Sequence, residues 1–186
     1  MKLMICCVLL PILFHMGQST NRSTQPFRTI SIQKKENGYR NFESVAFTSQ
    51  RDLDSFLKDT SRQIGWNNRQ EFEAALRNAK VDFTEEALVL LRHTEGSGSV
   101  QVTFETPVLE DRKLLCKIRG RPIPPGHGGT TDMAYYCFAV AVSKSAVGQL
   151  EFQALEGGFS ERPLPPIVFQ LSEKQPSNKR FQRPRG

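Results

Sequence analysis

The sequence predicts an α+β domain: two N-terminal helices packed on a mostly antiparallel β-sheet or small sandwich, with disordered tails. Two segments with helical spacing of apolar residues precede about five to seven segments with strand character, an order typical of this class. Residues 133–142 form the most apolar stretch outside the N-terminus and contain neither Gly nor Pro. Such a run predicts a central strand covered on both faces.

The two faces of this expected strand differ in the size of their side chains. Tyr136, Phe138 and Val140 alternate with Cys137 and Ala139. Because successive side chains of a strand point to opposite faces, one face is large and the other is small. We expect another layer of the fold to approach most closely over the small face.

Two helices are expected before the strands. Residues 50–62 carry apolar side chains at helical spacing, and Ser49 stands at the capping position. A second helix is expected after Asn67 or Asn68. Trp66, the only Trp of the chain, lies between them. We expect its ring to fill the hinge between the two helices.

Further strands are expected over residues 87–91, 100–105, 114–119 and 147–152. The first of these is apolar throughout and predicts a second central strand. The next two alternate apolar and polar residues, which predicts strands with one exposed face. Residues 92–99 and 120–132, rich in small and polar residues, are expected to be loops.

Composition divides the chain into a signal peptide, a flexible linker, one domain and a Pro-rich, mostly disordered basic tail, over residues 1–19, 20–41, 42–154 and 155–186. The chain carries a net charge of +6, but residues 42–154 carry −2, so the excess lies in the flanks. A nucleic-acid-binding domain gathers basic residues on its folded surface, so we expect no nucleic-acid partner. The basic tail offers contact with an anionic surface; the alternative is a solvated end.

The N-terminus has the features of an export signal. Lys2 precedes a short apolar run that ends at Phe14, and the small residues Gly17 and Ser19 follow. We therefore expect a secreted or periplasmic protein after cleavage. Only Cys116 and Cys137 would then remain, and in an oxidising compartment we expect them to form a disulfide. The alternative is two unlinked buried thiols.

Residues able to carry out catalysis are few. His93 and His127 lie in expected loops, and Asp132 follows the second of them. With a carboxylate or a Ser they would allow a small hydrolase or a metal-dependent enzyme, but no motif of either kind is present. We therefore expect no enzyme activity and no cofactor, with the enzyme kept as the alternative.

A binding surface is expected where the two loops meet. If the strands over residues 87–91 and 133–142 are antiparallel neighbours, both loops lie at the same end of the sheet, where rigid strands present them for recognition. The mildly basic surface predicted there carries Arg92, His93, Arg119, Arg121 and His127. The alternative is a plain solvated rim.

The order of the segments resembles a known family. It runs from helices to Val81-Asp82-Phe83, the strand over residues 87–91, a Gly/Ser turn and an alternating strand, and it ends with Thr131, Tyr135, Tyr136, Ala139, Val140, Val142 and Lys144. Over about residues 44–153 this is similar to the C-terminal domain of PrcB-type protease complex subunits, a small exported bacterial module. Ala134 stands where that family often has Pro. The resemblance implies a non-catalytic module that binds a protease or an envelope component.

Overall fold

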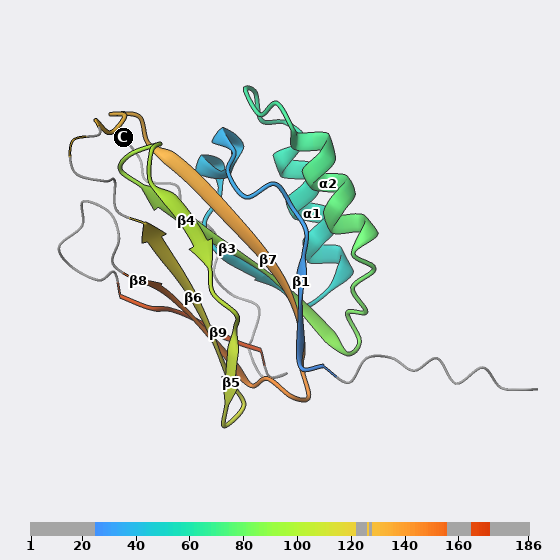
Figure 1. Ribbon diagram of the computed structural model, residues 1–186. Helices are drawn as coiled ribbons and strands as arrows, with labels where there is room; N and C mark the ends of the chain where they lie inside the picture. Colours follow the sequence, from blue (N-terminus) through green and yellow to red (C-terminus); the bar gives the residue numbers. More distant parts are fainter. Residues whose placement is uncertain (1–24, 122–125, 127, 156–164, 172–186) are drawn as a thin grey trace, which may run out of the picture.

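The computed structural model describes residues 25–121, 126, 128–155 and 165–171, which form three layers (Figure 1). Two helices cover one face of a four-stranded sheet, here called sheet A, and a five-stranded sheet, sheet B, covers the other. The α+β class is confirmed. The described residues contain nine strands, more than the five to seven expected.

Sheet A has the strand order β1-β7-β3-β2, and all its neighbouring strands are antiparallel. Its strands are β1 (Phe27–Ile30), β2 (Val45–Phe47), β3 (Glu86–Glu95) and β7 (Ala134–Ser143). The two long apolar strands β3 and β7 are central, as their composition predicts. β3 continues through Arg92 to Glu95, a segment expected to be a loop, because it pairs with the first residues of β7.

Sheet B has the strand order β4-β6-β8-β9, and β5 pairs with β6 beside β4. Its strands are β4 (Gln101–Phe104), β5 (Val108–Glu110), β6 (Lys113–Arg121), β8 (Gln149–Leu155) and β9 (Ile167–Gln170). β6 and β8 are parallel, whereas the other pairs are antiparallel. β4 and β5 together form one interrupted edge strand, because β8 occupies the other edge of β6.

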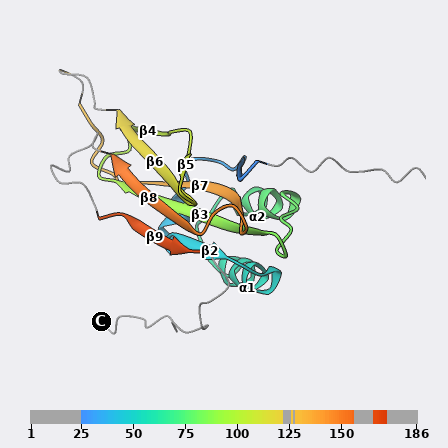
Figure 2. The ribbon, with the colours of Figure 1, turned by 90° about the horizontal axis from the view of Figure 1, so that it is seen from below.

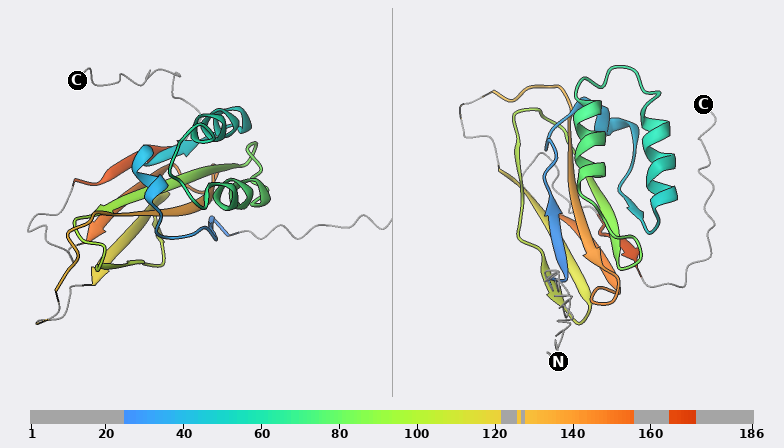
Figure 3. Two further views of the ribbon diagram at one scale, coloured as in Figure 1. Left: turned by 90° about the horizontal axis from the view of Figure 1, so that it is seen from above. Right: turned by 90° about the vertical axis from the view of Figure 1, so that its right-hand side faces the viewer.

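The helices α1 (Gln50–Thr60) and α2 (Arg69–Asn78) lie side by side on sheet A, on the side away from sheet B (Figures 2 and 3). The side chain of Ser49 accepts a hydrogen bond from the backbone N–H of Asp52, which is the predicted cap. The buried residues of the two helices pack in one core with residues of β3 and β7: Leu53, Leu57, Phe72 and Leu76 with Leu88, Leu90 and Ala139.

The two faces of β7 divide as the sequence predicts. Tyr136, Phe138 and Val140 belong to the core between the two sheets. Cys137 and Ala139 belong to the core between sheet A and the helices. The helix layer therefore lies over the face with the small residues.

The predicted disulfide is wrong, because the two cysteines lie in different cores. Cys116 is buried between the sheets, whereas Cys137 is buried beneath the helices on the other face of β7. Both are free thiols. The backbone of sheet A separates the two side chains, which point into different cores.

Residues 25–41, expected to be part of a flexible linker, belong to the fold. β1 pairs with β7, and the backbone of Lys34 and Glu36 bonds to β7 further along the same edge. A 3₁₀-helix, η1 (Asn37–Asn41), follows, with Tyr39 fully buried against the helices. The polar composition of this segment concealed its role, because much of its contribution is backbone hydrogen bonding to β7.

The tail begins later than expected. β8 extends to Leu155, and β9, which lies within the expected tail, pairs with β8 and is followed by the buried Leu171. The remaining tail residues and the expected signal peptide lie outside the described residues. No helix in the described part of the chain is long and apolar enough to cross a membrane.

Candidate functional site

The described parts of the two predicted loops lie together at one end of sheet A. β3 and β7 are antiparallel neighbours, with Glu95 opposite Ala134. The backbone N–H of Gly98 donates to the carbonyl of Asp132 at 2.8 Å, and Lys35 Nζ donates to the carbonyl of Gly98 at 2.8 Å. A Cβ at position 98 would lie 3.0 Å from the Asp132 carboxylate, so glycine permits this close approach.

The arginines predicted to share a surface at this end do not share one. Arg92 projects from β3 toward the helix side, where it bonds to Glu43 at 2.6 Å and lies over the Tyr135 ring. Arg119 projects from the outer face of sheet B and bonds to Glu105 at 2.7 Å. Arg121 is exposed on that same outer face, because it alternates with the inward-facing residues of β6. Because successive side chains of a strand point to opposite faces, Arg92 lies on the helix side of sheet A, whereas Arg119 and Arg121 lie on the outer face of sheet B. His127 lies outside the described residues.

His93 lies in β3 and not in a loop. Its side chain is 10% exposed, and its Nε2 atom lies 2.7 Å from Oε1 of Glu95, which is on the same face of the strand. Tyr136 lies opposite His93 across the ladder and donates to the carbonyl of Val100 at 2.6 Å. Burial and the nearby Glu95 raise the pKa of Tyr136. At this end of the core between the sheets, His93 therefore bonds to Glu95, and Tyr136 bonds to the backbone of Val100.

Asp132 has other partners than His93, namely Thr130 and Lys35. A hydrogen bond from Thr130 lowers the pKa of the Asp132 carboxyl, and Lys35 acts in the same direction. Among the residues that the structure describes, no group of three or more His, Cys, Asp or Glu side chains is placed to hold a metal ion. Because His93 bonds to Glu95 and Asp132 to Thr130, the described residues do not show the His–Asp pair on which the alternative, an enzyme, would depend.

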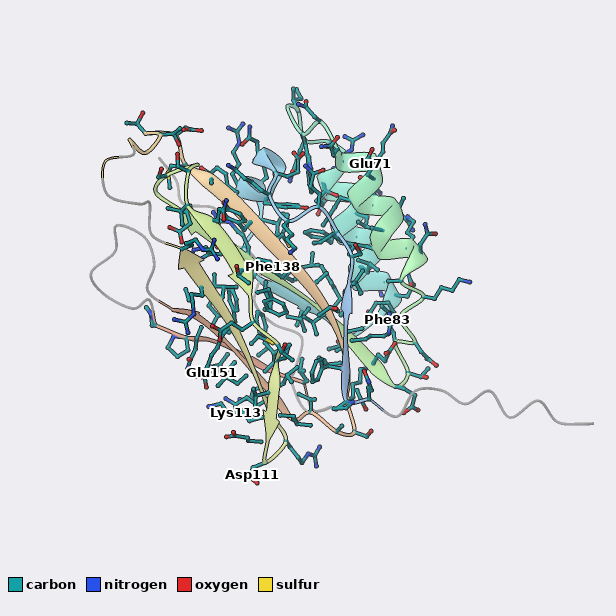
Figure 4. The ribbon with its side chains drawn as sticks, viewed as in Figure 1. Glu71, Phe83, Asp111, Lys113, Phe138 and Glu151 are labelled. Atoms are coloured by element: carbon teal, nitrogen blue, oxygen red, sulfur yellow. The ribbon has the colours of Figure 1, made fainter. Side chains whose placement is uncertain are left out.

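A groove that the sequence did not predict lies along the open side of the sandwich. It has a volume of about 630 Å³ and runs between β1 at the edge of sheet A and the break between β4 and β5 at the edge of sheet B. Its apolar lining includes Phe27, Phe104, Pro107 and Phe138. Phe104 and Phe138 stack with ring centroids 4.9 Å apart, and Figure 4 shows Phe138 between the sheets.

The local sequence explains why the groove is open at this place. β4 ends at Phe104 and β5 starts at Val108, so the edge strand of sheet B is interrupted over residues 105–107. Pro107 has no backbone N–H and cannot continue a ladder on that residue. β1, which faces this break, is a short strand of four residues. Pro107 between two alternating segments is the one sequence signal that indicates a broken edge.

Comparison with known proteins identifies no family for this chain. No protein-family model, no curated protein sequence and no solved structure matches the chain.

Proposed function

We propose that this chain is an exported, non-catalytic module that binds a protein partner, and that the groove beside β1 is its binding site. The observation that carries the proposal is an apolar groove flanked by two strand edges, β1 and the broken β4–β5 edge. Free strand edges and apolar grooves are the features by which many domains bind extended polypeptide segments. The export signal expected over residues 1–19 supports a secreted or periplasmic location.

Two further features support a binding role over catalysis. His93 and Asp132, the residues on which an enzyme would depend, are each held by a neighbour in the chain, Glu95 and Thr130. The resemblance to PrcB-type subunits makes a protease complex or an envelope component the first class of partner to test. The basic residues near the C-terminus offer a second contact, with an anionic surface.

Photo-crosslinking in the cells that make the protein tests the proposal. A benzoyl-phenylalanine is placed at Thr106, an exposed residue that lines the groove, and, as a matched control, at Arg51, an exposed residue of α1. We expect a discrete protein adduct from position 106 and none from position 51, and mass spectrometry identifies the partner. Adducts of equal yield at both positions, or none at position 106, would show that the groove is not a binding site.

A further inference from the structure

On the side that faces the groove, the backbone of β1 has hydrogen-bonding groups that no other described residue uses. Ser143 donates its N–H to the carbonyl of Pro26, which fixes which residues of β1 bond to β7. In an antiparallel ladder these residues alternate, so Arg28 and Ile30 bond to β7 while Phe27 and Thr29 direct their N–H and C=O groups away from it. β1 is the outermost strand of sheet A, so these groups are open to a further strand.

A strand added beside β1 would place its side chains in a defined pattern. Residues opposite each other in a sheet point to the same face. The side chains opposite Phe27 and Thr29 would therefore enter the groove, toward Phe104 and Phe138. Their neighbours in the added strand would point to the other side and stay in contact with water. The groove thus favours an extended segment with apolar residues at alternate positions.

The charges of the groove favour an acidic segment. Three charged residues line it: Arg28, Lys34 and Glu105. Arg28 is neutralised by Glu86 at 3.1 Å, and Glu105 by Arg119 at 2.7 Å. Lys34 has no side-chain partner among the described residues, so it leaves the groove with a net positive charge.

The same charge argument selects a separate protein as the occupant. Residues 172–186 of this chain carry five basic residues and one acidic residue, so their charge has the same sign as Lys34. β1 of a second copy contains Arg28 and no acidic residue. Neither this tail nor a second β1 complements the groove.

We propose that the groove binds an extended acidic segment of a partner protein, which adds to β1 as a fifth strand of sheet A. This inference rests on the proposed function and specifies its binding mode.

Phage selection of short random peptides on the folded protein supplies the probe. We expect the selected peptides to alternate apolar residues and to carry at least one Asp or Glu. In hydrogen exchange, the bound peptide should protect the amides of Phe27 and Thr29, because these donate to an added strand. Protection confined to other residues, such as β9 or the loop at residues 96–99, would overturn strand addition and leave the protein-binding function standing.

Two variants test the backbone and the charge separately. Thr29→Pro removes an N–H that β7 does not use, which an edge strand tolerates, and should weaken peptide binding about tenfold. Lys34→Glu should weaken it by about fivefold, and replacing the peptide's acidic residue with Lys should restore it, since opposite charges attract. Lys58→Glu, the same change on the exposed face of α1, serves as the control.

Thermal unfolding is used first to check that each variant is folded. If Thr29→Pro unfolds the chain, protection of the Thr29 amide by the peptide in the wild-type protein becomes the test of strand addition, and absence of that protection overturns it. Equal loss of binding with Lys58→Glu and Lys34→Glu would overturn the charge argument. Failure to select any peptide, together with no adduct at position 106, would overturn the proposed function as well.

Discussion

The two sheets of this molecule differ in how many of their faces are covered. Sheet A lies between the helices and sheet B, and every residue of β7 from Ala134 to Val142 is buried apart from the partly buried Tyr135. The described residues cover sheet B on one face only, and β6 alternates buried with exposed or partly buried residues along its length. The comparison shows that a continuous apolar run marks a strand covered on both faces, whereas alternation of apolar and polar residues marks a strand covered on one face.

The largest expected effect comes from truncating consecutive leucines in each sheet. In β3, Leu90 and Leu91 are both fully buried on opposite faces, so Leu90→Ala and Leu91→Ala should each lower the free energy of unfolding by about 2–5 kcal/mol. In β6, Leu114→Ala should cost as much, but Leu115→Ala should cost less than Leu114→Ala, because its side chain is only partly buried, on the outer face of the sheet. Urea denaturation measures all four. A large cost at Leu115 would indicate that a further layer covers sheet B.

A smaller effect is expected where the chain closes over the helix side of sheet A. A Cβ added to Gly38 would lie about 2.0 Å from the Trp66 ring, which is itself buried. Gly38→Ala should therefore cost about 1–3 kcal/mol through overpacking. Gly96→Ala, with nothing within 4 Å of the new atom, is the control and should be nearly neutral. The same urea series separates them, and equal costs would argue against a tight contact at Trp66.

The thiols test whether sheet A separates the two cores. Protein lacking residues 1–19 should react with a thiol reagent at two sites when unfolded, and slowly or not at all when folded, because Cys116 and Cys137 are buried and free. A bonded pair would give no reaction in either state. Non-reducing mass spectrometry provides an independent count.

Burial of the thiols also predicts a loss of stability at alkaline pH. Burial raises the pKa of Cys116 to about 12 and raises that of Cys137 as well. In the unfolded chain the thiols ionise near pH 8.5, so each stabilises the fold below that pH and loses its contribution as pH rises toward the folded value, at roughly 1 kcal/mol per pH unit. Urea denaturation between pH 8 and 9.5 should show a shallower slope for Cys116→Ala. An unchanged slope would contradict the assignment.

The smallest expected effect concerns the ion pair that fixes β1 to sheet A. Partial burial acts to raise the pKa of Glu86, but hydrogen bonds from Arg28 and from the Asp82 backbone lower it by more. The pair stabilises the fold above the unfolded pKa of about 4.3, and this contribution is lost as pH falls. Since the groups are partly exposed, Glu86→Gln should cost less than about 1 kcal/mol at pH 7 and should flatten the acid dependence below pH 5. An acid dependence equal to that of the wild type would exclude this pair as its source.

Sequence reasoning succeeded where one strand's side chains carry the information. The apolar run of β7 indicated its central place, and its alternate residues indicated one large and one small face, of which the helices cover the small one. It failed where contacts depend on strand order. Cys116 and Cys137 each have apolar neighbours, but nothing in the sequence states that β6 faces one side of β7 and that Cys137 points to the other.

The candidate site was missed for a related reason. A groove between two sheet edges depends on which strands are outermost, and the pairing of β1 with β7 joins segments at opposite ends of the domain. The predicted loop surface used residues of the correct end of the sheet, yet the parity of β3 and β6 sends Arg92 and Arg119 to opposite faces of the sandwich.

The parallel pairing of β6 with β8 has a consequence for how the chain folds. After β6 the chain crosses into sheet A as β7 and only then returns to sheet B as β8. Sheet A therefore lacks a central strand until the chain has passed through β6, and sheet B lacks β8 until β7 has formed. Phe27, near the start of the fold, pairs with Val142, more than a hundred residues later, so β1 cannot join sheet A before β7 is made. Contacts so distant in sequence require the closure of long loops, which slows folding. We expect the domain to refold in a single cooperative step, with neither sheet populated alone as an intermediate.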